Sequence, residues 1–342
     1  MFILRSVKPD DLKDLYKLSS ILVFINLPQD EEIIGQKIES SMKSFHNPSP
    51  KLFENYYIFV IEDLETHQIH GVSMIHAQHG TEDEPHFYLT VGQEAKFSNT
   101  INTGFVHGTL KLGLDSYGPT EIGGLILNPE FRGHSEKLGK QLSFVRFLYM
   151  AANPERFKPM VHSELMPPLD KNGNSPLWEA VGRRFLNMNY HEADILSRNN
   201  KEFILSLFPS ENIYQTLLPM EARESIGKVG KETEPVKKML ESIGFKYTFE
   251  VDPFDGGPHY RCPLKEIKPI KEKITGHLIT NKSFNKAEAR DVIISLAHPD
   301  HDFFALRTHL QVHGDGQVSL DPQLVKDLGI SLPQKITAIP FA

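Results

Sequence analysis

The chain has almost no cysteine and no long apolar run. Cys262 is its only cysteine, so no intramolecular disulfide can form, and nothing indicates an oxidising compartment. No stretch reaches the roughly 20 apolar residues that a membrane-spanning helix needs. The N-terminus, with charges at Arg5, Lys8 and Asp10, lacks the apolar core of a signal peptide. These absences predict a cytoplasmic protein without a membrane segment.

A strong positive charge and a dinucleotide-binding glycine turn are also missing. The formal net charge is -7, which argues against a broad nucleic-acid-binding surface. No Gly-x-Gly-x-x-Gly turn follows the first expected strand at residues 2–4, so a doubly wound dinucleotide-binding fold is disfavoured. The 342 residues, 39% hydrophobic and 24% charged, are typical of a globular chain with roughly two domains.

The most informative segment runs from Glu121 to Ala152. A short apolar strand, Leu125–Leu127, leads through a polar turn into a helix that is expected to start near Ser135. The first N–H groups of a helix have no partner within it and suit an anionic ligand. Positive charges and glycines lie at that point: Arg132, Gly133, Lys137, Gly139 and Lys140. The segment is therefore either a pyrophosphate-binding turn or an ordinary strand-to-helix connection of an α/β protein.

Strands and helices alternate along most of the chain. Residues 56–61 and 71–77 are expected to pair as an antiparallel hairpin. A stretch rich in Lys, Glu and Pro at 263–273 marks the best domain boundary, and short strand-like pieces follow it. We therefore predict two domains, residues 1–262 and a small β-rich domain of residues 263–342. The second would pack on the first, because so short a piece buries little core alone.

Histidines gather at two places, but neither has the spacing of a metal site. His298–Asp302 contains metal-ligand residue types without a closed ligand spacing, so a solvated loop is expected there. His70, His76 and His79 are expected to be surface-facing strand histidines rather than ligands. The sequence thus predicts no metal site.

One acidic residue is a candidate for chemistry. Glu164 lies beside apolar Leu165 in an expected strand next to the strand of Leu125. A partly buried carboxylate at this place could act as a base or bind a cationic substrate. A structural partner role is the alternative.

Several strings of unusual composition carry a family resemblance. They are Phe59–Asp63, Leu125–Arg132, Ser175–Ala180, Ala193–Asp194 and Phe254–Pro258. In this order they resemble the arginine N-succinyltransferase family of the GNAT acyltransferase superfamily, over essentially residues 1–262. The C-terminal segment is similar to that family's too. The resemblance implies an α/β fold, a mixed, twisted sheet flanked by helices, with a small C-terminal β-rich appendage.

The same resemblance implies a reaction. A CoA-dependent N-acyltransferase of this family moves succinyl from succinyl-CoA to the α-amine of L-arginine, in arginine catabolism, without a metal. The turn after Leu127 would hold the CoA pyrophosphate, and a backbone N–H near Leu125 would polarise the thioester carbonyl. The expected CoA-binding residues are Leu125, Leu127, Arg132, Gly133, Lys137, Leu138, Gly139 and Lys140. Association with a like or related subunit is also implied.

The chain departs from the family pattern at three places. The position of the family's proton-donating histidine is Gly230 in this chain. Of the Gly-Asn-Gly string in the family's phosphate turn, this chain retains only Gly139. A family arginine is replaced by Met166. A different amine acceptor such as ornithine, or a non-catalytic homologue that binds CoA or a partner subunit, is therefore an alternative. If the enzyme hypothesis holds, Glu164 is the expected base or acceptor-binding carboxylate. Asp255 follows as a second candidate that otherwise only orders its turn.

Overall fold

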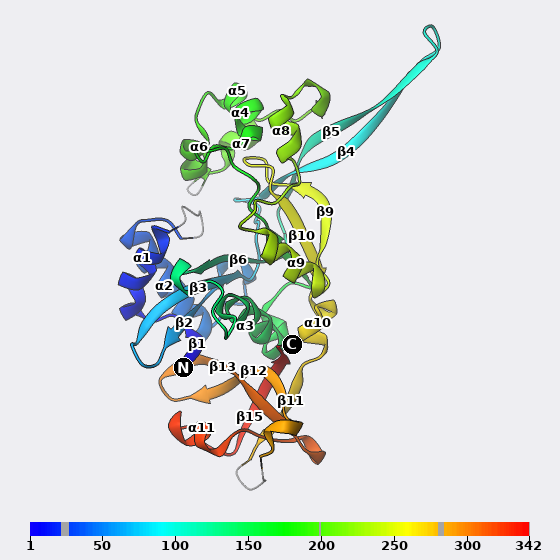
Figure 1. Cartoon of the computed structure of the whole chain (residues 1–342). Helices are drawn as coiled ribbons and strands as arrows, with labels where there is room; N and C mark the ends of the chain where they lie inside the picture. Colours follow the sequence, from blue (N-terminus) through cyan, green and yellow to red (C-terminus); the bar gives the residue numbers. More distant parts are fainter. Residues whose placement is uncertain (22–26, 198–199, 280–283, 342) are drawn as a thin grey trace. The chain divides into compact units, whose positions relative to one another are not determined.

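The computed structural model describes residues 1–21, 27–197, 200–279 and 284–341. The chain forms two compact units, each assembled from segments that are separate in the sequence. The first comprises residues 1–78, 120–159 and 263–342, and the second comprises residues 79–119 and 160–262. Figure 1 labels most of the helices and strands of both units. Among the described residues, no helix combines the length and the apolar character that crossing a bilayer requires.

The first unit is built on an antiparallel sheet. Its segments 1–78 and 120–159 contain β1 (Phe2–Ser6), β2 (Tyr56–Asp63), β3 (Gln68–His76) and β6 (Thr120–Leu127), with helices α1 (Leu12–Ser19), α2 (Glu31–His46) and α3 (Leu138–Ala152). β1 pairs with β2, β2 with β3, and β3 with β6. The predicted hairpin of residues 56–61 and 71–77 is thereby confirmed.

Alternate residues of β2 face opposite sides of this sheet. Ile58 and Val60 belong to a buried cluster with apolar residues of α1 and α2. Tyr57 and Phe59 contact the ring of Tyr149 in α3 instead. The strand is therefore buried on both faces, which explains its nearly continuous apolar sequence.

Residues 263–342 add a ring of five strands to the same unit. They are β11 (Ile274–Leu278), β12 (Arg290–His298), β13 (His301–Val312), β14 (Gln317–Ser319) and β15 (Gln334–Pro340), with the short helices α10 (Lys268–Lys271) and α11 (Pro322–Asp327). β13 pairs with β12 and β14, β11 with β14 and β15, and β12 with β15, so the ring closes. The expected β-rich character is confirmed.

The long strand β13 also joins this ring to the N-terminal strand, because Leu4 of β1 stands opposite Ala305. The sheet hydrogen bonding is therefore continuous from residue 2 into the C-terminal segment. Whether residues 263–342 fold as a separate domain stays a prediction.

The strands of the second unit follow the order β7-β10-β9-β4-β5-β8. Its strands are β4 (His86–Ser98), β5 (Thr103–Asp115), β7 (Met160–Glu164), β8 (Ile213–Tyr214), β9 (Lys246–Val251) and β10 (Pro258–Pro263). Its helices are α4 (Pro176–Ala180), α5 (Gly182–Leu186), α6 (Tyr190–Ser197), α7 (Glu202–Leu207), α8 (Met220–Ser225) and α9 (Glu234–Ser242). In Figure 1, β4 and β5 form a long hairpin that extends beyond the helices of this unit. The fully buried Trp178 stacks on Phe254 in the core.

Candidate active site

The strand β6 carries a bulge at the residues expected to contact the acyl group. Val72 of β3 stands opposite Ile126, whereas Met74 stands opposite Gly123, so two residues of β6, Gly124 and Leu125, oppose one residue of β3. Gly124 has a φ of +56°, in the left-handed region that favours glycine. A bulge takes residues out of the regular ladder, so it can present a backbone N–H to a ligand.

The turn after β6 is shaped by its own side chains and backbone. The Asn128 side chain accepts the N–H of Glu130, and Gly133 has a φ of +74°. Lys137 also lies in the left-handed region, with a φ of +57°. Because this conformation interrupts helical geometry, α3 begins at Leu138, somewhat later than the expected start near Ser135.

The turn is anchored by rings. Phe131 stacks on His70 with ring centroids 3.8 Å apart, and both rings contact Phe2. His70 is therefore buried, and the prediction that it faces the surface is wrong. The cause is a tertiary contact, since the ring that covers it lies about 60 residues further along the chain.

The expected phosphate-binding residues do not share one environment. Arg132, Gly133 and Lys137 are exposed, and Gly139 is half-buried near the Leu127 side chain. Lys140 instead donates to the Phe341 carbonyl at 2.6 Å. The role of these residues in holding a pyrophosphate stays a prediction.

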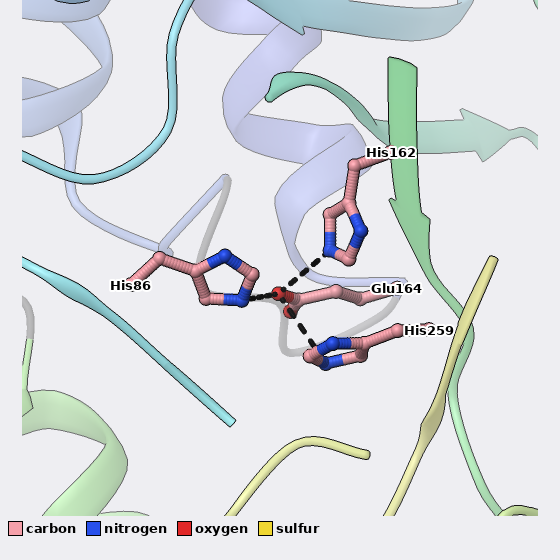
Figure 2. A group of neighbouring side chains, drawn as sticks. All are labelled: His86, His162, Glu164 and His259. Carbon is pink, nitrogen blue, oxygen red and sulfur yellow. Dashed lines mark hydrogen bonds and ion pairs between the residues drawn. The ribbon is translucent and has the colours of Figure 1, made fainter. Parts of the chain in front are cut away.

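In the second unit, three histidines surround Glu164. Figure 2 shows their rings converging on its carboxylate: His86 at the start of β4, His162 in β7 and His259 in β10. Their Nε2 atoms lie 3.1, 3.3 and 3.7 Å, respectively, from Glu164 Oε1. The histidines are at most 2% exposed. The Glu164 side chain is 29% exposed, so it is the accessible member.

Burial and mutual charge set the protonation of this cluster. Burial, with smaller contributions from neighbouring histidines, lowers the pKa of His86 to about 4 and that of His162 to about 3. Burial alone would raise the pKa of Glu164, but hydrogen bonds and charge from the surrounding histidines outweigh it and hold that pKa well below its ordinary value. The cluster thus places the neutral imidazoles of His86 and His162 beside an ionised carboxylate.

Asp255 occupies the expected tight turn. It accepts the N–H of Gly257 at 2.7 Å, while Asp252 accepts the N–H of Phe254 and that of Asp255 itself. Burial, and then the charge of Asp252, raises the pKa of Asp255 well above its ordinary value. Its hydrogen bond shows that Asp255 orders the turn, and a catalytic role stays a prediction.

Gly230, at the position of the family's histidine, is tied to the chain that follows β7. Its N–H donates to the Met166 carbonyl at 2.9 Å, and a Cβ at this position would lie 3.0 Å from the Pro167 carbonyl oxygen. An imidazole here would therefore require a local shift. In this chain the position supplies no titratable side chain.

The sequence analysis selected Glu164 but missed its three neighbours. His86, His162 and His259 come from strands that are distant in the sequence. A spacing search detects ligands only when they are close along the chain, so it had no signal for this cluster. Because side chains two residues apart in a strand lie on the same face, the expected strand around Glu164 could have indicated that His162 and Glu164 share one face.

Comparisons with known proteins agree with the sequence resemblance. The family model of the arginine N-succinyltransferase beta subunit matches residues 2–269. An arginine N-succinyltransferase of Escherichia coli is 34% identical over 275 residues, which are 80% of this chain and 79% of the relative, and one of Shigella dysenteriae has the same values. The structure of the arginine/ornithine succinyltransferase subunit AI from Pseudomonas aeruginosa matches with a TM-score of 0.85 and 26% identity, and the match covers 100% of this chain and 99% of that one. The expected fold class is therefore confirmed.

Proposed function

Because the chain belongs to the arginine N-succinyltransferase family, we propose that it transfers succinyl from succinyl-CoA to the α-amine of L-arginine. The structural observation that carries this proposal is the bulge at Gly124 and Leu125, immediately before the turn that leads into α3. The bulge and the helix terminus are suited to the two ends of an acyl-CoA, the thioester and the pyrophosphate.

On the donor side, the backbone is the main binding element. The N–H of Leu125 would donate to the thioester carbonyl oxygen and stabilise the negative charge that develops there. The first N–H groups of α3 would receive the pyrophosphate, with Arg132 and Lys137 as nearby positive charges. Lys140 contributes less directly, because its ammonium group is bound to the Phe341 carbonyl.

On the acceptor side, we keep Glu164 as the leading carboxylate. It is accessible, and an ionised carboxylate can attract the cationic amino acid or take the ammonium proton before attack. The amine would attack the thioester directly, and CoA would leave as its thiolate. Cys262 is buried in β10, which disfavours a covalent acyl-cysteine intermediate.

Two narrower questions belong to the proposal. The acceptor is arginine or ornithine, since the Pseudomonas protein is described by both names. The alternative is a non-catalytic homologue that binds CoA or a related subunit, and the observation behind it is the replacement of the family's histidine by Gly230. The cytoplasmic location and the association with another subunit also stay predictions, and light scattering after gel filtration tests the latter.

The test is release of free CoA from succinyl-CoA, measured with a thiol reagent in the presence of arginine, ornithine or lysine. We expect release that depends on arginine or ornithine. Glu164→Gln should lower turnover about 100-fold or more if Glu164 is the base. Asp255→Asn tests the second candidate: its amide oxygen can still accept the Gly257 N–H, so turnover should be retained if Asp255 only orders its turn. Folded protein that releases no CoA with any of the amines would refute the enzymatic proposal.

A further inference from the structure

The three histidines and Glu164 have the composition and placement of a metal-binding site. We propose that the second unit binds one divalent transition-metal ion, Zn²⁺ being the best fit, through Nε2 of His86, His162 and His259 and Oε1 of Glu164. Imidazole nitrogen and carboxylate oxygen are both common zinc ligands. The four ligand atoms all lie within 4.8 Å of one another.

The distances suit a tetrahedral ion. With zinc bonds of about 2.0–2.1 Å, neighbouring ligand atoms in a tetrahedron are about 3.3 Å apart. The three Nε2 atoms lie 3.1, 3.3 and 3.7 Å from Glu164 Oε1. These three separations are close to that value, and all four ligand atoms lie within 4.8 Å of one another, so the side chains would have to draw together around an ion.

Hydrogen bonding alone does not explain why these histidines are buried together. His162 forms a hydrogen bond with Glu164 at 3.3 Å. In the described part of the chain, however, Nδ1 of His86 and both ring nitrogens of His259 have no hydrogen-bond partner, and Nε2 of His86 faces only the Glu164 carboxylate, 3.1 Å away. Leaving buried polar atoms unpaired is costly. A metal ion would satisfy one nitrogen of each ring, and Figure 2 shows both rings directed at the carboxylate.

The surrounding charges define what must change on binding. Arg261 forms an ion pair with Glu250 at 2.8 Å and donates from Nε to Nδ1 of His162 at 3.3 Å. Coordination through Nε2 places the proton of a neutral imidazole on Nδ1, so Arg261 must turn away from His162 and stay with Glu250. Glu250 also lies 3.9 Å from Nδ1 of His259. By moving slightly closer, its carboxylate would accept a hydrogen bond from the Nδ1–H and so orient this ligand.

Four protein ligands leave no open position, so the ion would be structural. It would fasten β4 to the neighbouring strands β7 and β10, from which β9 separates it in the sheet order. This assignment makes Glu164 a metal ligand in place of a free base. Measuring both turnover and bound metal in Glu164→Gln separates the two roles. If Glu164 is a ligand, the variant loses metal and turnover together. If Glu164 is the base, the wild-type protein holds no metal and the variant loses turnover alone.

The test uses the full chain after treatment with a chelator. Titration with Zn²⁺ by calorimetry should show about one equivalent bound, and Co²⁺ should give the visible absorption of a tetrahedral nitrogen and oxygen site. Zn²⁺ should also raise the unfolding temperature. His259→Ala and Glu164→Gln should each weaken Zn²⁺ binding by more than the 10–100-fold typical of substitutions around the ligands. Glu164→Gln preserves side-chain volume, so it covers the case in which His259→Ala fails to fold.

His107→Ala is the matched control. His107 lies in β5 of the same unit, hydrogen-bonded to Thr216 and outside the cluster, so its loss should leave Zn²⁺ affinity unchanged. Folded protein that binds no Zn²⁺ at millimolar concentration would overturn the proposal. The same holds if the Glu164→Gln and His107→Ala variants bind Zn²⁺ with equal affinity. The titration contains neither CoA nor arginine, so its result is independent of the transferase assay.

Discussion

Replacing Gly124 by alanine tests whether the bulge in β6 is needed for both folding and acyl transfer. Gly124 has a φ of +56°, and a Cβ there would lie 2.5 Å from Met74 Sδ and 2.9 Å from Met74 Cγ. The left-handed conformation costs a residue with a Cβ about 1–2 kcal/mol. Displacing a buried side chain costs about 1–3 kcal/mol more. Since methionine is flexible, we expect a total near the lower end, about 2–4 kcal/mol.

Gly133→Ala separates the two contributions. Gly133 has a comparable φ of +74°, but a Cβ there would meet nothing within 4 Å. This variant should therefore lose only the conformational part, about 1–2 kcal/mol. Urea unfolding followed by circular dichroism measures both losses. Adding Met74→Ala to Gly124→Ala should not restore the geometry of the bulge, although it removes the close contact.

The activity of the same variants tests the proposed role of the Leu125 N–H. If this N–H stabilises the developing oxyanion, shifting the bulge should lower turnover of succinyl-CoA about 10²–10³-fold. Gly133→Ala leaves the bulge intact, so it should lower turnover less than Gly124→Ala does. The reasoning is wrong if Gly124→Ala is no less stable than Gly133→Ala and releases CoA at the wild-type rate.

Two further predictions concern the stability of the first unit. Arg5→Met should lower the free energy of unfolding by about 3–5 kcal/mol, because it leaves the buried carboxylates of Asp11 and Glu62 without the Arg5 cation. Lys17→Met breaks an exposed pair and should lower it by less than about 1 kcal/mol. Equal losses for the two variants in urea unfolding would contradict this. Burial, and then nearby positive charges, lowers the pKa of His301 to about 4. The unfolded chain takes up this proton near pH 6.5, so stability is lost as the pH falls from about 6.5 to 4, by at most about 1.4 kcal/mol per pH unit and less because solvent screens a partly exposed ring. His301→Phe should flatten the dependence of the urea midpoint on pH in that range, and an unchanged slope would exclude His301 as its source.

Local sequence pattern predicted the elements whose formation depends on neighbours along the chain. The hairpin of β2 and β3, the strand at Leu125 and the helix that ends at Ala152 all follow from short periodic runs. The exact start of α3 did not, because the left-handed conformation of Lys137 depends on how the whole turn packs. The register that creates the bulge at Gly124 likewise needs a partner strand.

The sequence by itself therefore determined the family, the fold class and one carboxylate of the candidate site, Glu164. Only the tertiary structure decided what surrounds that carboxylate. His86, His162 and His259 are each unremarkable in their own strands, and it is the pairing of those strands into one sheet that places three imidazoles around one oxygen. The same applies to His70, whose burial depends on Phe131 folding back over it. Periodicity reports which face a residue lies on, whereas contacts between distant strands determine what that face meets.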